Sequence, residues 1–366
     1  METNGKTAAV GMSGGVDSTV TAWLLKRQGY RVIGVTMLIG DDRMGSTLRL
    51  RIGCAAGSNE ERLEKVRRWS ERLGIPHIAV PLAGEFQARV LDYFRDEYSA
   101  GRTPNPCVIC NRAIKFGVLL DKAAEQAPFD VFATGHYARI AFDAATGRYQ
   151  LLKGSHTVKD QSYFLCGLSQ AQLARTLFPL GEMTKTDVRA LAREAGFPEL
   201  AEGGESQDFM DSREFGEAFG PDLLKPGPIL DLEGRELGRH PGIMRYTIGQ
   251  RKGLGLHGGT GDPLYVIRLD AERRAVIVGP REALFRKSLL AKDMNWISMA
   301  PPAGAFRTEA RIRQQHKPAP ATAVPEPGDS SRMTVTFDEP QPAITPGQAV
   351  ALYDGERVVA GGTIED

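Results

Sequence analysis

The 366-residue sequence has few of the features that mark membrane, secreted or strongly charged proteins. No apolar run approaches the ~18 residues of a membrane helix, and the first residues are polar where a signal peptide turns apolar. Four cysteines in so long a chain do not make a disulfide framework. The 46 basic and 45 acidic residues nearly cancel, which excludes a uniformly basic nucleic-acid coat but allows local basic patches. These absences predict a cytoplasmic protein with no membrane partner, and the length predicts two or three domains.

Hydrophobic patterning divides the chain into two parts. Up to about residue 200, short apolar runs alternate with longer amphipathic ones, the pattern of a parallel sheet with helices on both faces. The predicted strands are 8–12, 32–38, 75–82 and 131–134, and the predicted helices are 19–27, 60–73, 86–98, 113–126 and 184–195. From about Pro226 the segments are short and alternating, which predicts a mostly β structure. The Pro- and Ala-rich stretch 317–328 is expected to be an exposed loop.

The segment from Gly11 to Ser18 predicts a phosphate-binding loop. A buried strand leads into Ser-Gly-Gly, and a helix is expected to begin near Asp17. The glycines let backbone amides approach an anion, the serine hydroxyls add donors, and the helix N-terminus favours negative charge. Asp17 is a candidate ligand for the Mg²⁺ that accompanies nucleotide phosphates. Because the Walker lysine is missing, the loop is not expected to cleave ATP between its β and γ phosphates, and it resembles the PP-loop of ATP pyrophosphatases instead.

Two cysteines precede a predicted helix. Cys107 and Cys110 follow two prolines that exclude helix up to that point, and the amphipathic run 113–126 comes next. Cys110 is therefore expected near a helix N-terminus, where the dipole stabilises a thiolate that can act as a nucleophile or sulfur carrier. A four-thiolate zinc site is disfavoured, because Cys54 and Cys166 are isolated in the sequence and are expected to be small buried residues. An iron–sulfur cluster needs at least three thiolates, which these two cysteines and one more could supply.

The loop SGGVDS together with GRTPNPCVICNRAIKFG resembles one family closely, the tRNA-specific 2-thiouridylases of the MnmA type. The likeness covers nearly the whole chain and includes, in the family's order, the segments 133–138, 159–165, 181–185, 205–207, 245–251 and 361–365. It implies that ATP adenylates the 2-oxygen of the wobble uridine in tRNAs for Lys, Glu and Gln, and that a sulfur donor then displaces AMP. It also implies an α/β PP-loop domain (1–204), a small central domain (205–272) and a C-terminal β-barrel (273–366).

The resemblance also implies roles for individual residues. Cys110 would be the nucleophile, and we add Cys107 and Asp17 as further catalytic residues. The ATP-binding residues would be Gly11, Met12, Ser13, Gly14, Gly15, Val16, Asp17, Ser18, Met37 and Gly135. Asn105, Pro106 and Cys107 would lie against the target base. Further contacts to tRNA would come from Lys159, Asp160, Gln161, Arg313 and Gln314.

One position departs from the family pattern. Many members carry a second catalytic cysteine where this chain has Met210, and no cysteine occurs after Cys166. A thioether cannot form a persulfide, so Met210 cannot replace the missing cysteine. The additional thiol in this chain is Cys107, three residues before Cys110. Cys107 is expected either to close a disulfide with Cys110 or to anchor, with Cys110 and either Cys54 or Cys166, an iron–sulfur cluster that binds incoming sulfide. We favour the cluster, because a disulfide would leave no persulfide carrier distinct from the nucleophile. The remaining alternative is a partner protein that delivers persulfide to Cys110 alone.

Two other functions compete with this interpretation. Another PP-loop ligase that adenylates a small molecule would explain SGGVDS but not the cysteines or the β-rich tail. A catalytically impaired tRNA-binding homologue would explain the missing second cysteine, but the intact phosphate loop and Cys110 argue against it. The favoured function requires ATP and Mg²⁺ as cofactors, tRNA as a partner, and a sulfur-donor protein or free sulfide as the source of sulfur.

Overall fold

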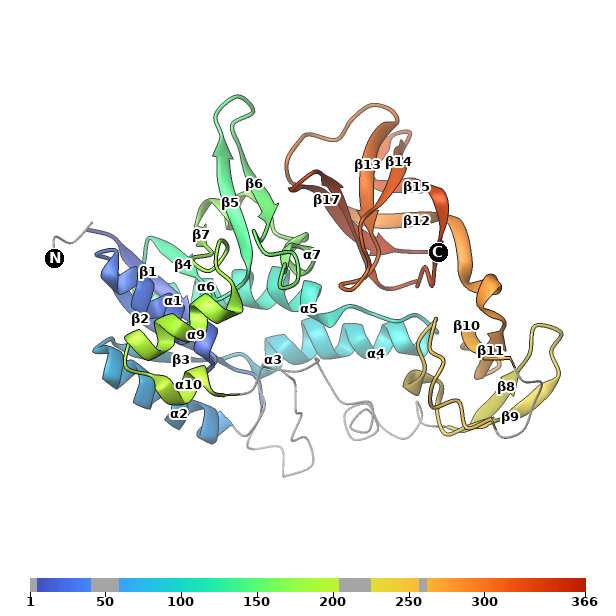
Figure 1. The fold of residues 1–366 in the computed structure, drawn as a ribbon, viewed down its shortest axis with the longest axis horizontal. Helices are drawn as coiled ribbons and strands as arrows, with labels where there is room; N and C mark the ends of the chain where they lie inside the picture. Colours follow the sequence, from blue (N-terminus) through green and yellow to red (C-terminus); the bar gives the residue numbers. More distant parts are fainter. Residues whose placement is uncertain (1–4, 41–58, 204–224, 257–261) are drawn as a thin grey trace.

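The computed structural model describes residues 5–40, 59–203, 225–256 and 262–366. Their strands form three sheets of five, four and eight strands. Figure 1 shows the N-terminal α/β unit at one end, the barrel strands β12–β17 at the other, and the four-stranded sheet beside the barrel. Within the described part of the chain, no helix has the length and apolar character needed to cross a membrane.

The N-terminal sheet is parallel and has the strand order β3-β2-β1-β4-β7, as the alternating pattern predicts. Its strands are β1 (Thr7–Gly11), β2 (Arg31–Leu38), β3 (His77–Pro81), β4 (Val131–Ala133) and β7 (Thr176–Leu177). Successive side chains of a strand point to opposite faces. Accordingly, Ala8 and Val10 pack in one core cluster and Ala9 in another. The sheet is therefore buried on both faces.

Helices cover both faces of this sheet. One group packs against Ala8 and Val10 and consists of α1 (Val16–Arg27), α2 (Asn59–Leu73), α9 (Lys185–Glu194) and α10 (Pro198–Ala201). The other packs on the face of Ala9 and consists of α3 (Ala83–Phe86), η2 (Gln87–Leu91), α4 (Asp92–Ser99) and the run from α5 to α6. The α/β fold class predicted from the sequence is thus confirmed.

The helix that follows the prolines begins earlier than predicted. It runs through α5 (Pro106–Ile109), the π-helical η3 (Cys110–Val118) and α6 (Leu119–Gln126). Pro106 occupies the first turn, where the missing N–H has no partner to lose, and the side chain of Asn105 caps the helix by accepting from the Val108 N–H at 3.3 Å. The prediction of a start at residue 113 was wrong, because proline excludes helix only beyond the first turn.

A hairpin that the sequence did not predict follows β4. Its strands, β5 (Ala138–Asp143) and β6 (Arg148–Lys153), extend the C-terminal sheet through the pairing of Leu152 with Arg357. The short helices α7 (Ser162–Leu165) and α8 (Gln170–Ala174) come next along the chain. The N-terminal part of the chain therefore contributes strands to the C-terminal sheet (Figure 1).

The C-terminal sheet closes into a barrel through the pairing of β12 with β17. Its strands are β12 (Phe285–Trp296), β13 (Phe306–Arg311), β14 (Ala319–Glu326), β15 (Asp329–Pro342), β16 (Ala349–Asp354) and β17 (Arg357–Ile364). The predicted loop at 317–328 was wrong, because most of it is β14. Ala321 and Ala323 alternate into the core and are fully buried. This alternation with a period of two, which is typical of a strand, outweighed the proline content in determining the structure of the segment.

The central sheet has the order β10-β11-β8-β9. Its strands are β8 (Gly227–Leu230), β9 (Glu236–His240), β10 (Tyr265–Asp270) and β11 (Ala275–Gly279), with the 3₁₀ turns η5 (Ile243–Arg245) and η6 (Arg281–Leu284) alongside. Because β11 pairs with both β10 and β8, this sheet continues past the domain boundary expected at residue 272.

Candidate active site

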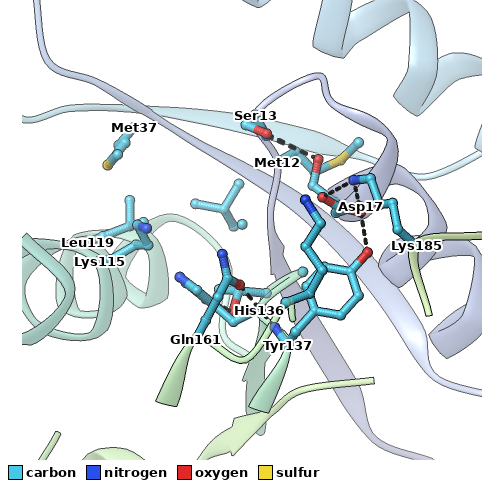
Figure 2. A pocket seen from close by; sticks show the side chains of 16 residues that line it. Met12, Ser13, Asp17, Met37, Lys115, Leu119, His136, Tyr137, Gln161 and Lys185 are labelled. Atoms are coloured by element: carbon cyan, nitrogen blue, oxygen red, sulfur yellow. Dashed lines mark hydrogen bonds and ion pairs between the residues drawn. The ribbon is translucent and has the colours of Figure 1, made fainter. Parts of the chain in front are cut away.

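A cavity of about 350 Å³ opens where β1, β2 and β4 end at their carboxyl edges (Figure 2). This edge is where open parallel sheets bind ligands. Of the residues expected to bind ATP, the cavity brings together Gly11, Met12, Ser13, Asp17, Ser18, Met37 and Gly135. The remaining three, Gly14, Gly15 and Val16, do not line it. Seven of the ten residues expected to bind ATP therefore line one cavity, which is called the nucleotide cavity after that expectation, and its walls contain further side chains.

The phosphate loop connects β1 to α1 and is shaped by its own hydroxyls. The Ser13 N–H donates to Ser18 Oγ at 3.3 Å, and Ser18 Oγ donates to the Gly15 carbonyl at 3.1 Å. Gly14 has a φ of +80°, which residues other than glycine rarely adopt. Gly15 is the N-cap of α1 and has no side chain to cap the first turn. The N-terminus of α1 is therefore suited to binding an anion.

The carboxylate of Asp17 is engaged by two side chains that sequence reasoning missed. Lys185 Nζ lies 2.7 Å from both carboxylate oxygens, and the Tyr137 hydroxyl donates to Oδ1 at 2.8 Å. A Cβ at Gly135 would lie 2.8 Å from Asp17 Cβ, so glycine is required for this close approach. Both of these residues lie in segments on which the family resemblance rests, 133–138 and 181–185. Nothing in the sequence, however, indicated that they contact Asp17.

The opposite wall of the cavity comes from the helix that carries the cysteines. Lys115 and Leu119 face Met37 there (Figure 2). His136 lies below them, with Nδ1 2.6 Å from Thr134 Oγ1. Burial, with a smaller effect of the Lys115 charge, holds the pKa of His136 well below its usual 6.5. The imidazole is therefore neutral at physiological pH.

Acidification is expected to destabilise the protein through its buried histidines. Burial is the main cause of lowered pKa values for His77, His136, His240 and His316, and the pKa of His77 falls to about 4. A folded-state pKa below the unfolded value of 6.5 gives stability that is present above pH 6.5 and is lost as pH falls toward 4. The melting temperature should therefore fall from about pH 6.5 to about pH 5, and less steeply in His77→Gln. Equal melting temperatures across this range would contradict the prediction.

The two cysteines of the CxxC segment occupy successive turns of one helix. Cys107 is half-buried in the first turn of α5, whereas Cys110 is 4% exposed at the start of η3. The N-terminal position expected for Cys110 is thus held by Cys107. Neither residue lines the nucleotide cavity, although Lys115 and Leu119 of the same helical run do. π-Helical turns are frequent at functional sites.

The third thiol expected for an iron–sulfur cluster is not supplied by Cys166. This residue is 1% exposed, and burial raises the pKa of its thiol to about 12. In the described ranges no three Cys, His, Asp or Glu side chains gather as a metal site. Cys54 and Met210 lie outside the described residues. Cys166 is a small buried residue, as its isolation in the sequence predicts.

Several residues expected to contact tRNA also make contacts within the protein. Asp160 is 3% exposed and pairs with Arg311 of β13 at 2.7 Å. Gln314 donates to the Asp160 carbonyl at 2.7 Å. Arg313 is half-buried and donates to the Pro342 carbonyl at 3.0 Å. The contacts of Arg311 and Gln314 with Asp160 join the barrel to the N-terminal part of the chain, whereas the contact of Arg313 lies within the barrel.

The other expected tRNA contacts divide between the cavity and the barrel. Lys159 and Gln161 line the nucleotide cavity, and Gln161 Oε1 accepts from the Tyr137 N–H at 3.0 Å. Pro106 is buried, and Asn105 Nδ2 lies 3.4 Å from Gln348 Oε1 of the barrel. The segment before the cysteines is therefore docked on the barrel.

Comparisons with known proteins match all three parts of the chain. Residues 6–210 match the family model of the tRNA methyl transferase HUP domain, residues 221–280 that of the tRNA methyl transferase PRC-barrel domain, and residues 286–364 that of the aminomethyltransferase beta-barrel domain. The tRNA-specific 2-thiouridylase MnmA of Endomicrobium trichonymphae is 44% identical over 370 residues and covers 100% of both chains. That of Chloroflexus aggregans is 48% identical over 361 residues and covers 97% of each.

Likeness to solved structures is weaker. The crystal structure of a 4-thiouridine synthetase–RNA complex with bound ATP is 20% identical, with a TM-score of 0.37, and covers 56% of this chain and 44% of that one. A similarity of this size carries no argument about function.

Proposed function

This chain belongs to the family of tRNA-specific 2-thiouridylases, and we propose that it adenylates the 2-oxygen of the wobble uridine in tRNAs for Lys, Glu and Gln and then replaces that oxygen with sulfur. The observation that carries this proposal is the helical run 106–126. It carries Cys107 and Cys110 at its start and contributes Lys115 and Leu119 to the nucleotide cavity. One helical run, kinked at Gly117, therefore connects the thiols to the site of adenylation.

The cavity suggests how ATP would lie. Its phosphates would meet the hydroxyls of Ser13 and Ser18 and the N-terminus of α1, while the adenosine would lie toward Met37 on the opposite wall (Figure 2). Asp17 is the single carboxylate that lines the cavity in the part of the chain that the structure describes. This donor set suits Mg²⁺, which is usually bound by one or two carboxylates together with substrate phosphates. The metal would neutralise phosphate charge as pyrophosphate leaves.

Sulfur transfer is proposed to use the cysteine pair. A donor protein would place a persulfide on Cys110, and its terminal sulfur would attack C2 of the adenylated uridine and expel AMP. The Cys107 thiolate would then attack Cys110 Sγ, which breaks the S–S bond, leaves sulfur on the base and forms a Cys107–Cys110 disulfide. An external thiol would reduce this disulfide before the next cycle. Helix positions three residues apart are neighbours on one face, which supports this pairing.

An iron–sulfur cluster remains the second proposal for the thiols. Since Cys166 is buried and no three-ligand group occurs among the described residues, a cluster would depend on Cys54. We also propose that Asn105, Cys107, Lys159 and Gln161 meet the tRNA near the reacting base. For the domains we propose boundaries near residues 204 and 279, because the second keeps β11 within the central sheet.

Exchange of labelled pyrophosphate into ATP tests the proposed function. With the tRNA for Lys, Glu or Gln present, exchange should be rapid and the nucleotide products should be AMP and pyrophosphate. Without tRNA, exchange should be absent, because the acceptor oxygen belongs to the RNA. Exchange without tRNA would indicate a small-molecule ligase. A protein that binds tRNA but shows no exchange under any condition would be a non-catalytic homologue.

A further inference from the structure

The nucleotide cavity contains more positive charge than the phosphate loop alone explains. Among the described residues, three lysines line it, Lys115, Lys159 and Lys185, against the single carboxylate of Asp17. His136 adds no charge, because burial lowers its pKa. The lining therefore has a formal excess of cations, which complements a polyphosphate. Lys185 Nζ makes an ion pair with Asp17 at 2.7 Å.

Lys185 occupies a position that is unfavourable for a cation. It is the first residue of α9, and Thr184 and Asp187 form a capping box around it. The positive end of the helix dipole lies at this terminus and disfavours a positive side chain. The Lys185 side chain is also only 16% exposed, so its ammonium has lost much of its hydration. The ion pair with Asp17 compensates for both effects.

We propose that Lys185 binds the pyrophosphate portion of ATP and performs the task of the Walker lysine that the PP-loop lacks. On entry of ATP with Mg²⁺, the ammonium exchanges its contact with Asp17 for oxygens of the β and γ phosphates. This inference rests on the proposed adenylation. As the bond between the α phosphorus and the bridging oxygen breaks, the electron pair goes to pyrophosphate, and the Lys185 charge stabilises it. Lys185 stays protonated throughout.

The surrounding contacts support this exchange. Figure 2 shows Lys185, Asp17 and Tyr137 together on the side of the cavity opposite Met37 and Leu119, which is the side of the phosphate loop. The Tyr137 hydroxyl donates to Asp17 Oδ1 at 2.8 Å, a contact that does not involve Lys185. Asp17 therefore keeps its orientation while its other oxygen becomes available to the metal that arrives with ATP.

Binding measurements on the full chain test the proposal without tRNA. In Lys185→Met, the dissociation constants of ATP with Mg²⁺ and of pyrophosphate should rise by ~10–100-fold, the usual effect of losing a hydrogen bond between charged groups. The dissociation constant of AMP should change by less than about 2-fold, because AMP lacks the β and γ phosphates. Lys185→Arg should recover most of the affinity. Lys122→Met is the matched control, since Lys122 pairs with Glu85 outside the cavity.

A second variant separates binding from folding. Lys185→Met leaves Asp17 without its cation. The double variant Asp17→Asn/Lys185→Met, which removes this unpaired charge, is therefore compared with Asp17→Asn alone. The double variant should bind pyrophosphate ~10–100-fold more weakly than Asp17→Asn does. Unchanged pyrophosphate affinity in this comparison would overturn the proposal. Equal losses for AMP and pyrophosphate would also overturn it, because Lys185 would then merely support the loop. If the wild type shows the expected binding but no tRNA-dependent exchange, only the proposed function fails.

Discussion

Replacement of Cys110 by serine should reduce tRNA thiolation by about a thousandfold or more, while tRNA-dependent exchange of pyrophosphate into ATP survives. A serine hydroxyl can carry no persulfide, so the second half of the reaction is lost. The first half persists because Cys110 does not line the nucleotide cavity. Thiolated tRNA and exchange should be measured on the same preparation, so that a misfolded variant is recognised by loss of both.

Variants of the other cysteines distinguish between the possible routes of sulfur transfer. Cys107→Ser should also lose multiple-turnover thiolation, because no thiolate remains to release the sulfur. Cys166→Ala should thiolate normally, since Cys166 is 1% exposed in the core. If protein purified without oxygen contains iron and sulfide, and if Cys54→Ser loses both, the thiols hold a cluster and the disulfide route does not apply. Full activity of Cys107→Ser in iron-free enzyme would contradict both routes and leave delivery to Cys110 alone.

The second large effect is expected at the buried ion pair between Asp160 and Arg311. The two side chains are 3% and 9% exposed and lie 2.7 Å apart. Asp160 Oδ1 also accepts from the N–H groups of Gly154 and Ser162. Arg311→Met leaves a buried carboxylate without its cation, which should lower the free energy of unfolding by about 3–5 kcal/mol. Urea denaturation followed by circular dichroism measures this loss.

An exposed pair in the same barrel supplies the control. Arg307 and Asp338 make two bonds of 2.8 and 2.7 Å but are largely exposed, so Arg307→Met should cost less than about 1 kcal/mol. Asp160→Asn/Arg311→Met should recover much of the lost stability, because no buried charge is left unpaired. Similar losses in Arg311→Met and Arg307→Met would show that burial does not strengthen the inner pair.

The same pair should influence the nucleotide cavity. Asp160 lies between Lys159 and Gln161, which line the cavity, and Gln161 contacts Tyr137, which in turn contacts Asp17. The barrel thus holds one wall of the nucleotide site through Arg311. Arg311→Met should therefore also weaken ATP binding, although Arg311 itself lies outside the cavity.

Local patterns in the sequence were sufficient for the parts of this protein that depend on neighbouring residues. The apolar runs predicted the parallel strands, and SGGVDS after the first strand predicted the phosphate loop, because strand, turn and helix N-terminus are consecutive there. The helix predicted at 184–195 begins with a capping box formed by Thr184 and Asp187. Each of these features is determined within a few residues.

Contacts between distant residues were decided by the tertiary structure alone. Lys185 and Tyr137 reach Asp17 across 168 and 120 positions, and Asp160 reaches Arg311 across 151. No periodicity links such residues, so the sequence did not indicate that Asp160 is buried in an ion pair with Arg311. The segment 317–328 was expected to be a loop, because its prolines are visible in the sequence but the neighbouring strands that pair with it are not. Local sequence patterns indicated candidate functional groups, and only the packing of the chain decided which of these groups meet.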